Sequence, residues 1–231
     1  NNQRGINVSS AGKIQGGTSG AVIVEGTGGA STGVMNHGVH VIGANSIISS
    51  NGANVNVSGI SGGSSGSFAN FGVYVHGAGV ISAGGSGTVT VMGTGGSATG
   101  STNYGVYVTL LNASITSSGG NVSVIGQGGG SGFSGNNNGV YVSSTGIISA
   151  TGDGTLTVMG TGGSGSGHSN YGILLSGSNS QITSINGNLS LIGQGGGSGV
   201  SFANYGIYFD DNSIVSTTGT GTLSILGTGG N

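Results

Sequence analysis

The sequence predicts an all-β fold, a parallel β-solenoid of seven coils with three short strands in each coil. Three observations predict it. Gly makes up 58 of the 231 residues, whereas Pro, Cys and Trp are absent. Short runs of alternating Val and Ile are separated by Gly, Ser, Thr and Asn, which is typical of strands and turns. These runs also recur with a nearly constant period. The general preference of parallel crossovers predicts a right-handed coil.

One glycine, which we call the entry glycine, marks the start of each repeat. The spacing between successive entry glycines alternates between 33 and 34 residues. They are Gly5, Gly38, Gly72, Gly105, Gly139, Gly172 and Gly206. An alternating apolar pair follows each entry glycine, and a second pair begins 17 positions after it. We expect both pairs to point into the coil, because side chains alternate between the two faces of a strand.

A single Ile between the two pairs is expected to provide the core residue of the middle strand. These residues are Ile14, Ile47, Ile81, Ile115, Ile148, Ile182 and Ile214. We expect the one-residue alternation to fall wholly in the Gly-rich segment between repeats. That segment reads Gly-Thr-Gly-Gly in odd repeats and Gly-Gln-Gly-Gly-Gly in repeats 4 and 6. The unit is therefore a 67-residue pair, and residues 1–231 are expected to be a single array cut from a longer one, without caps.

Three stretches resemble a family of very large secreted bacterial surface proteins. They are Asn-Tyr-Gly-Val-Tyr-Val at 103–108, Gly-Ile-Ile-Ser at 146–149 and Leu-Thr-Val-Met-Gly-Thr-Gly-Gly at 156–163. The chain looks like filamentous-haemagglutinin-like and autotransporter-passenger β-helix proteins over its whole length. The resemblance implies secretion and an extracellular or cell-surface location. It transfers no functional residue.

The aromatic residues are expected on one edge of the solenoid, because all seven Tyr take only two offsets from the entry glycines. Tyr104, Tyr171 and Tyr205 directly precede an entry glycine, and Tyr74, Tyr107, Tyr141 and Tyr208 follow one by two residues. The five Phe lie within six residues of the same glycines. Two interpretations stay open. The edge is either a stacked ladder for packing within or between chains, or a surface that binds sugars.

Two further patterns are interpreted as structural. An Asn stands two residues before the entry glycine in six repeats, which predicts a ladder of side-chain amides between coils. These residues are Asn36, Asn70, Asn103, Asn137, Asn170 and Asn204. The outward neighbours of the second apolar pair are Thr in some coils and Asn or Ser in the others. This alternation favours an ordinary solvated strand face over an ice-binding array of Thr.

Composition argues against several classes of function. The net charge of −2 offers no electrostatic attraction for nucleic acid. No apolar run approaches the roughly 18 residues of a membrane span, so none is expected in this segment. The four His have different offsets and are not expected to converge with a carboxylate on a metal. Asp210 and Asp211 are the only adjacent acidic pair. We therefore expect no enzyme activity, no cofactor and no metal.

The favoured function is the structural repeat region of an extracellular or cell-surface fibre, sheath or matrix protein, with copies of itself as partners. The low charge favours this class, because nearly neutral surfaces offer little protection against association. The alternative is an adhesin whose aromatic edge binds surface glycans.

Overall fold

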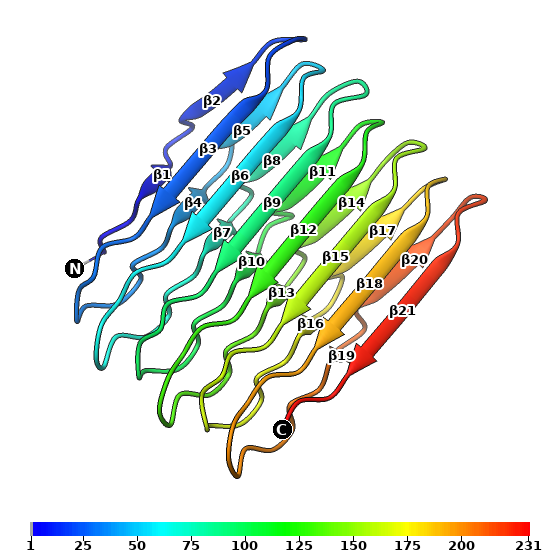
Figure 1. Cartoon of the computed structure of the whole chain (residues 1–231). Coiled ribbons are helices and arrows are strands. Elements are labelled where there is room, and N and C mark those ends of the chain that lie inside the picture. Colours follow the sequence, from blue (N-terminus) through cyan, green and yellow to red (C-terminus); the bar gives the residue numbers. More distant parts are fainter. Residues whose placement is uncertain (1) are drawn as a thin grey trace.

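The computed structural model describes residues 2–231, which form three parallel sheets of seven strands each (Figure 1). Each sheet takes one strand from every coil. Sheet A consists of β1 (Ile6–Val8), β4 (Val39–Ile42), β7 (Val73–His76), β10 (Val106–Thr109), β13 (Val140–Ser143), β16 (Ile173–Ser176) and β19 (Ile207–Phe209). Sheet B consists of β2 (Lys13–Gly16), β5 (Ile47–Ser50), β8 (Val80–Ala83), β11 (Ser114–Ser117), β14 (Ile147–Ala150), β17 (Gln181–Ser184) and β20 (Ile214–Thr217). Sheet C consists of β3 (Val22–Thr27), β6 (Val55–Ile60), β9 (Val89–Thr94), β12 (Val122–Gln127), β15 (Leu156–Thr161), β18 (Leu189–Gln194) and β21 (Leu223–Thr228).

The coils stack in chain order, so the two ends of the chain lie at opposite ends of the solenoid (Figure 1). Every strand pairs in parallel with the equivalent strand of the next coil, and the register aligns equivalent residues. Tyr107, for example, pairs with Tyr74 on one side and Tyr141 on the other. The predicted parallel β-solenoid of seven coils with three strands each is confirmed.

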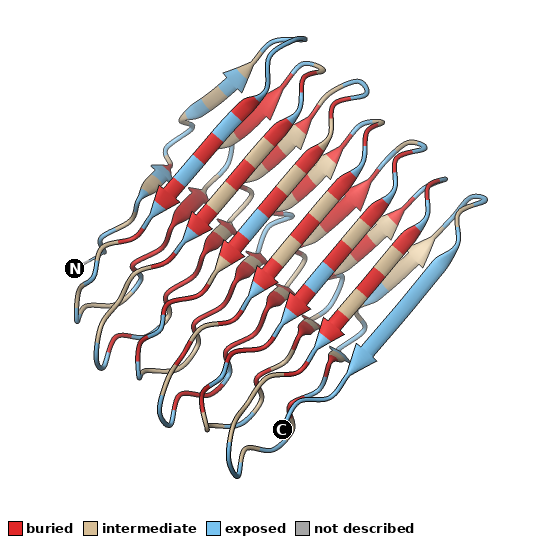
Figure 2. Ribbon diagram, in the orientation of Figure 1, coloured by how far each residue is buried: buried red, intermediate tan, exposed pale blue. Residues whose placement is uncertain are grey.

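The core consists of the inward side chains of the three sheets, and the predicted register is correct in the middle coils. Val106, Val108 and Ile115 are fully buried. Tyr107 and Ser123, which alternate with core residues, lie half-buried on the outer faces. Figure 2 shows this alternation as buried bands across the strands of the middle coils. A shift by one residue would turn all these valines outward, so the burial fixes the register.

The prediction for the middle strand is wrong at two of the seven positions. Ile47 is only half-buried and Ile214 is 42% exposed. The inward residues are instead their neighbours Ile48, which pairs with Ile81, and Val215, which pairs with Ile182.

The reason for the error at Ile47 is a pair of compensating turn lengths. The turn between the first and second strands has four residues in coil 2 (43–46) and three in coil 3 (77–79). The turn between the second and third strands has four residues in coil 2 (51–54) and five in coil 3 (84–88). These differences cancel before the third strand. The net difference of one residue between coils therefore falls in the Gly-rich segment, as expected, but the two turns also alternate in length, so the 67-residue pair differs at every corner of the coil.

The last coil differs from the others in burial, as the exposed strand β21 in Figure 2 shows. Leu223 and Ile225 occupy core columns but are 40% and 47% exposed, since the described structure has no coil on their outer side. Phe209 pairs with the fully buried Leu175 and therefore belongs to a core column. The expectation that every aromatic residue lies on one edge is wrong for this residue.

One corner of the coil is built by two columns of glycine that touch. A Cβ atom on Gly59, near the end of β6, would collide with the carbonyl oxygen of the entry glycine Gly72. A Cβ atom on Gly72 would in turn collide with the backbone nitrogen of Thr94, at the end of the third strand of the same coil. Equivalent contacts recur at Gly93 with Gly105 and along the column. Sheets A and C can therefore meet at this corner only where neither strand carries a side chain.

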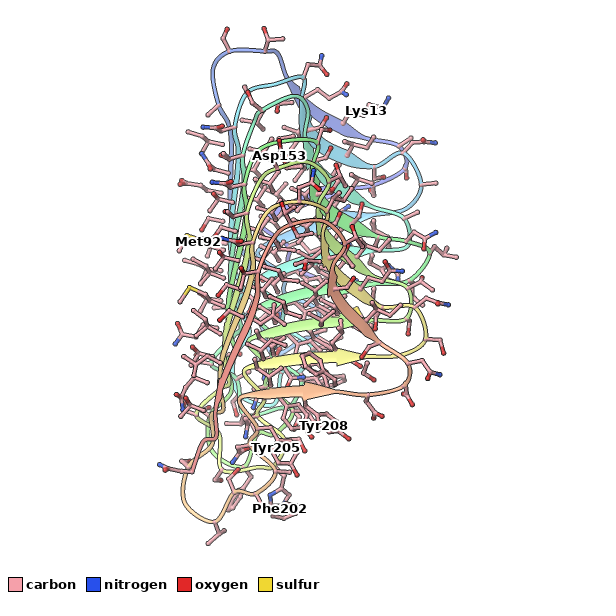
Figure 3. All side chains as sticks on the ribbon, turned by 90° about the vertical axis from the view of Figure 1, so that its right-hand side faces the viewer. Lys13, Met92, Asp153, Phe202, Tyr205 and Tyr208 are labelled. Carbon is pink, nitrogen blue, oxygen red and sulfur yellow. The ribbon has the colours of Figure 1, made fainter. Side chains whose placement is uncertain are left out.

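The Gly-rich segment leaves this corner as a loop that projects beyond the three sheets. In the view along the solenoid axis, Tyr208 projects from the outer side of β19, and Tyr205 lies beside it where the loop returns (Figure 3). The loop and the outer face of sheet A thus form an inside angle, and the aromatic residues lie in it.

The register can be tested at two neighbouring residues of β12. Val124→Asp would place an unpaired carboxylate in the core and should cost several kcal/mol. Ser123→Asp, on the outer face, should cost about 1 kcal/mol or less. Thermal melting followed by far-ultraviolet circular dichroism measures both. Equal losses in the two variants would show that the inward and outward positions are assigned wrongly.

Candidate functional site

An asparagine ladder runs through the base of the projecting loops. The side chains of all six predicted asparagines are buried, from Asn36 to Asn204. The Nδ2 atom of each Asn donates to the Oδ1 atom of the Asn in the following coil. The distances between successive pairs are 3.1 Å for Asn36–Asn70, 2.9 Å for Asn70–Asn103, 3.2 Å for Asn103–Asn137, 2.9 Å for Asn137–Asn170 and 3.4 Å for Asn170–Asn204.

The local backbone turns each asparagine into the ladder. The residue before it has a left-handed conformation in every coil, with φ of 61° at Met35, 55° at Ala69 and 63° at Thr102. The Oδ1 atom of Asn137 accepts a second bond from the backbone N–H of Asn103, at 3.0 Å. The amides are therefore engaged with one another and with the backbone. They link coils and present no free face to a ligand.

Two aromatic columns lie side by side in the angle between the loops and sheet A. The entry column holds the residues that directly precede the entry glycines. From coil 2 onward they are His37, Phe71, Tyr104, Asn138, Tyr171 and Tyr205. The strand column holds the residues two positions after the entry glycines. From coil 2 onward they are His40, Tyr74, Tyr107, Tyr141, Leu174 and Tyr208. All seven predicted tyrosines therefore belong to these two columns.

The rings stack within each column and meet edge to face between the columns. Tyr107 stacks on Tyr74 at 5.1 Å between ring centroids and on Tyr141 at 4.8 Å, with the ring planes within 10° of parallel. It also meets Tyr104 edge to face at 5.3 Å. Phe71 and Tyr104 stack in the entry column at 4.9 Å. Both geometries are favourable for aromatic pairs.

Both columns are interrupted near coils 5 and 6. Asn138 replaces an aromatic residue in the entry column, and Leu174 replaces one in the strand column. A larger aromatic group in coils 2–5 is thereby separated from a smaller one made by Tyr171, Tyr205 and Tyr208. Tyr205 and Tyr208 are 49% and 36% exposed. The rings of the larger group are buried or half-buried.

Burial or a nearby carboxylate raises the pKa of several of these tyrosines. Burial raises the pKa of Tyr74 and Tyr104 well above the ordinary value, with Tyr107 adding a smaller contribution. The pKa of Tyr208 is raised chiefly by the Asp210 carboxylate nearby. These hydroxyl groups are therefore neutral at physiological pH, and none is poised as a base.

Three of the four histidines lie together, although their different offsets did not predict a cluster. His37 and His40 are almost completely buried, with ring centroids 5.2 Å apart, and His40 lies 6.4 Å from His76. His37 and His40 occupy the same offsets as the tyrosines, and this shared spacing is the signal that could have found them. Stacking the coils brings His76, four residues after its entry glycine, beside them.

The histidine cluster is held neutral. Desolvation by burial is the main cause that lowers the pKa of His37 to about 2 and that of His40 to about 3, with smaller contributions from neighbouring histidines and from the Arg4 guanidinium. The Nδ1 atom of His40 lies 2.9 Å from Oδ1 of Asn7, and that of His37 accepts a bond from the backbone N–H of Phe71. The Nε2 atoms of both rings are buried without a partner.

The arrangement suits packing better than chemistry. Within residues 2–231, no group of three or more His, Cys, Asp or Glu side chains is arranged to hold a metal ion. Since the described residues form strands and turns, they include no helix with the length and hydropathy of a membrane span. No protein-family model, curated protein or solved structure matches the chain. The fold is that of β-solenoid repeat proteins in general.

The stacked columns predict unequal effects for two tyrosines at the same offset. Tyr107→Ser removes two stacked and two edge-to-face ring contacts and should cost about 2–4 kcal/mol. Tyr208→Ser, in the exposed last coil, should cost less than about half as much. The midpoints of urea unfolding measure the difference. If both variants unfold at the same urea concentration, the columns contribute little within the chain.

The histidine cluster predicts a loss of stability in mild acid. The unfolded chain takes up two protons below about pH 6.5, whereas the folded chain does so only at a pH of about 3 and 2. Folding stability should therefore fall as the pH drops below 6.5, by about 2 kcal/mol per histidine at pH 5.

The control variant copies the next coil. His37→Phe with His40→Tyr reproduces Phe71 and Tyr74 at the same offsets. Hydrogen exchange of the amides in β4 at pH 7 and pH 5 compares the two chains, after correction for the intrinsic exchange rate. The parent should open more readily at pH 5, and the double variant should not. An equal change in both would assign the acid sensitivity to other groups.

Proposed function

We propose that the chain is the structural repeat region of an extracellular or cell-surface fibre, sheath or matrix protein that associates with copies of itself. The observation that carries this proposal is the distribution of charge. No Asp, Glu, Lys or Arg occurs between Glu25 and Asp153, so coils 2, 3 and 4 carry no formally charged side chain. Surfaces of this kind do not repel copies of themselves.

The regular stacking supports a structural role. The backbone hydrogen-bond ladders of the three sheets run along the solenoid axis. The asparagine ladder and the aromatic columns run in the same direction. The polar and aromatic side chains in these columns therefore hold each coil to the next. The resemblance to filamentous-haemagglutinin-like and autotransporter-passenger proteins supports secretion and a cell-surface location. Together these features favour a rigid, self-associating segment.

The alternative is an adhesin that binds surface glycans through the aromatic edge. Sugars stack on the faces of aromatic rings, and in coils 2–5 those faces are covered by neighbouring rings about 5 Å away. Exposed rings remain at Tyr205 and Tyr208 and on the loops, where Phe133 is 93% exposed. The stacking therefore favours the structural function over sugar binding.

Association of the parent chain tests the proposal. We expect assemblies that grow between about 1 and 100 μM and that persist when NaCl is raised from 50 to 500 mM, because salt screens charge interactions but does not weaken apolar ones. Sedimentation velocity and electron microscopy measure the size and shape of the assemblies. A chain that stays monomeric at 100 μM would contradict the proposal, and binding of that monomer on a glycan array would favour the adhesin.

A further inference from the structure

The outer face of sheet C carries a partly exposed apolar stripe, although the sequence predicts an ordinary solvated strand face there. The fourth residue of each strand points outward there, and from coil 3 onward it is large and apolar. We call these residues the sheet C stripe: Met92, Ile125, Met159, Ile192 and Leu226. Met92, Met159 and Leu226 are 48%, 39% and 59% exposed. Figure 3 shows Met92 projecting from this face, on the opposite side of the wall from the core.

Polar columns without charge flank the stripe on both sides. Thr90 and Thr94 flank Met92, and Ser123 and Gln127 flank Ile125. Coil 5 repeats the first pattern and coil 6 the second. The face is therefore apolar along its centre and lined by hydroxyl and amide groups, with a period of two coils.

The stripe ends toward the N-terminus. In coils 1 and 2 its position is taken by Glu25 and Ser58. The small Ser58 leaves a shallow hollow of about 340 Å³ between Ile23 and Met92. The usable apolar surface is thus coils 3 to 7, and the one carboxylate of this face lies outside it.

A second copy of the chain fits this surface better than a charged ligand does, since coils 2 to 7 place no charged side chain on the face. Two sheets commonly pack face to face at about 10 Å. Five strands of six residues cover about 24 Å by 20 Å. Packing two such faces buries about 1,000 Å² in total, which is the lower bound for a specific interface. An interface of this size is weak on its own.

We propose that two copies pack through the sheet C stripe with their axes antiparallel and the two-fold axis at coil 5. This arrangement places Met159 against its own counterpart, Ile125 against Ile192 and Met92 against Leu226. The polar residues that flank the stripe also meet residues of the same type, because Gln127 faces Gln194 and Thr94 faces Thr228. Glu25 stays outside the interface. The inference rests on the proposed function, since it names the surface through which the chain associates.

The opposite arrangement is less favourable. Parallel copies related by a two-fold axis along the solenoid would place each coil against its own counterpart, and Glu25 would then face Glu25. Two carboxylates at such close range repel each other. An antiparallel pair centred on coil 4 would instead bury Glu25 against Leu226, at the cost of desolvating an unpaired charge.

Single cysteines test the arrangement, because the chain contains none. Met159→Cys lies on the two-fold axis and should form a disulfide-linked dimer under mild oxidation at tens of μM. Met92→Cys is the matched control, since its counterpart lies four coils away, about 19 Å along the axis. It should cross-link at least tenfold less. A mixture of the Met92→Cys and Leu226→Cys chains should cross-link as heterodimers.

The inference is overturned if the Met159→Cys and Met92→Cys chains cross-link equally. It is also overturned if neither chain cross-links while the parent assembles. Both results leave the proposed function intact. A parent chain that does not associate at all removes the proposed function instead. Met159→Lys is an independent test of the surface, because the side chain points outward and its replacement leaves the core unchanged. It should weaken association at least tenfold with an unchanged melting temperature, and unchanged association would exclude this surface.

Discussion

The structure depends on the contact between two glycine columns at one corner of the coil. Where the backbone near Gly59 meets the entry glycine Gly72, neither residue has room for a Cβ atom. This contact lets the wall formed by sheet C run directly into the start of sheet A. The chain between them has to leave the corner as a loop and return to it. The inside angle that holds the aromatic columns, and the loop base that holds the asparagine ladder, both follow from this single steric constraint.

Stacking then multiplies each local choice along the axis. A coil buries only a few aliphatic side chains, and its ordering costs more free energy than that burial supplies. The coils are therefore stabilised by their neighbours, through backbone ladders, amide pairs such as Asn70 with Asn103 and ring pairs such as Tyr74 with Tyr107. The 67-residue alternation changes the lengths of the turns and loops, yet it leaves all of these columns aligned.

The outer surfaces of the solenoid have different roles. The aromatic columns of sheet A are largely occupied with one another and with the loops. The outer face of sheet C has no such cover and combines an apolar centre with uncharged flanks. A structural, self-associating segment is consistent with both features. The proposed surface for association is therefore the neighbouring wall formed by sheet C and not the aromatic edge.

The sequence by itself determined the solenoid, the columns of equivalent residues and the inward valines, because stacked coils turn a linear period directly into contacts. It could not determine that Ile48, rather than Ile47, enters the core, since the compensating turn lengths cancel before the next recognisable pair. Nor could it separate the outward tyrosine of β10 from the outward isoleucine Ile125 of β12, which show the same alternation with core residues. Only the tertiary structure decided which wall is covered, because the loops that leave the glycine corner fold beside sheet A and leave sheet C bare.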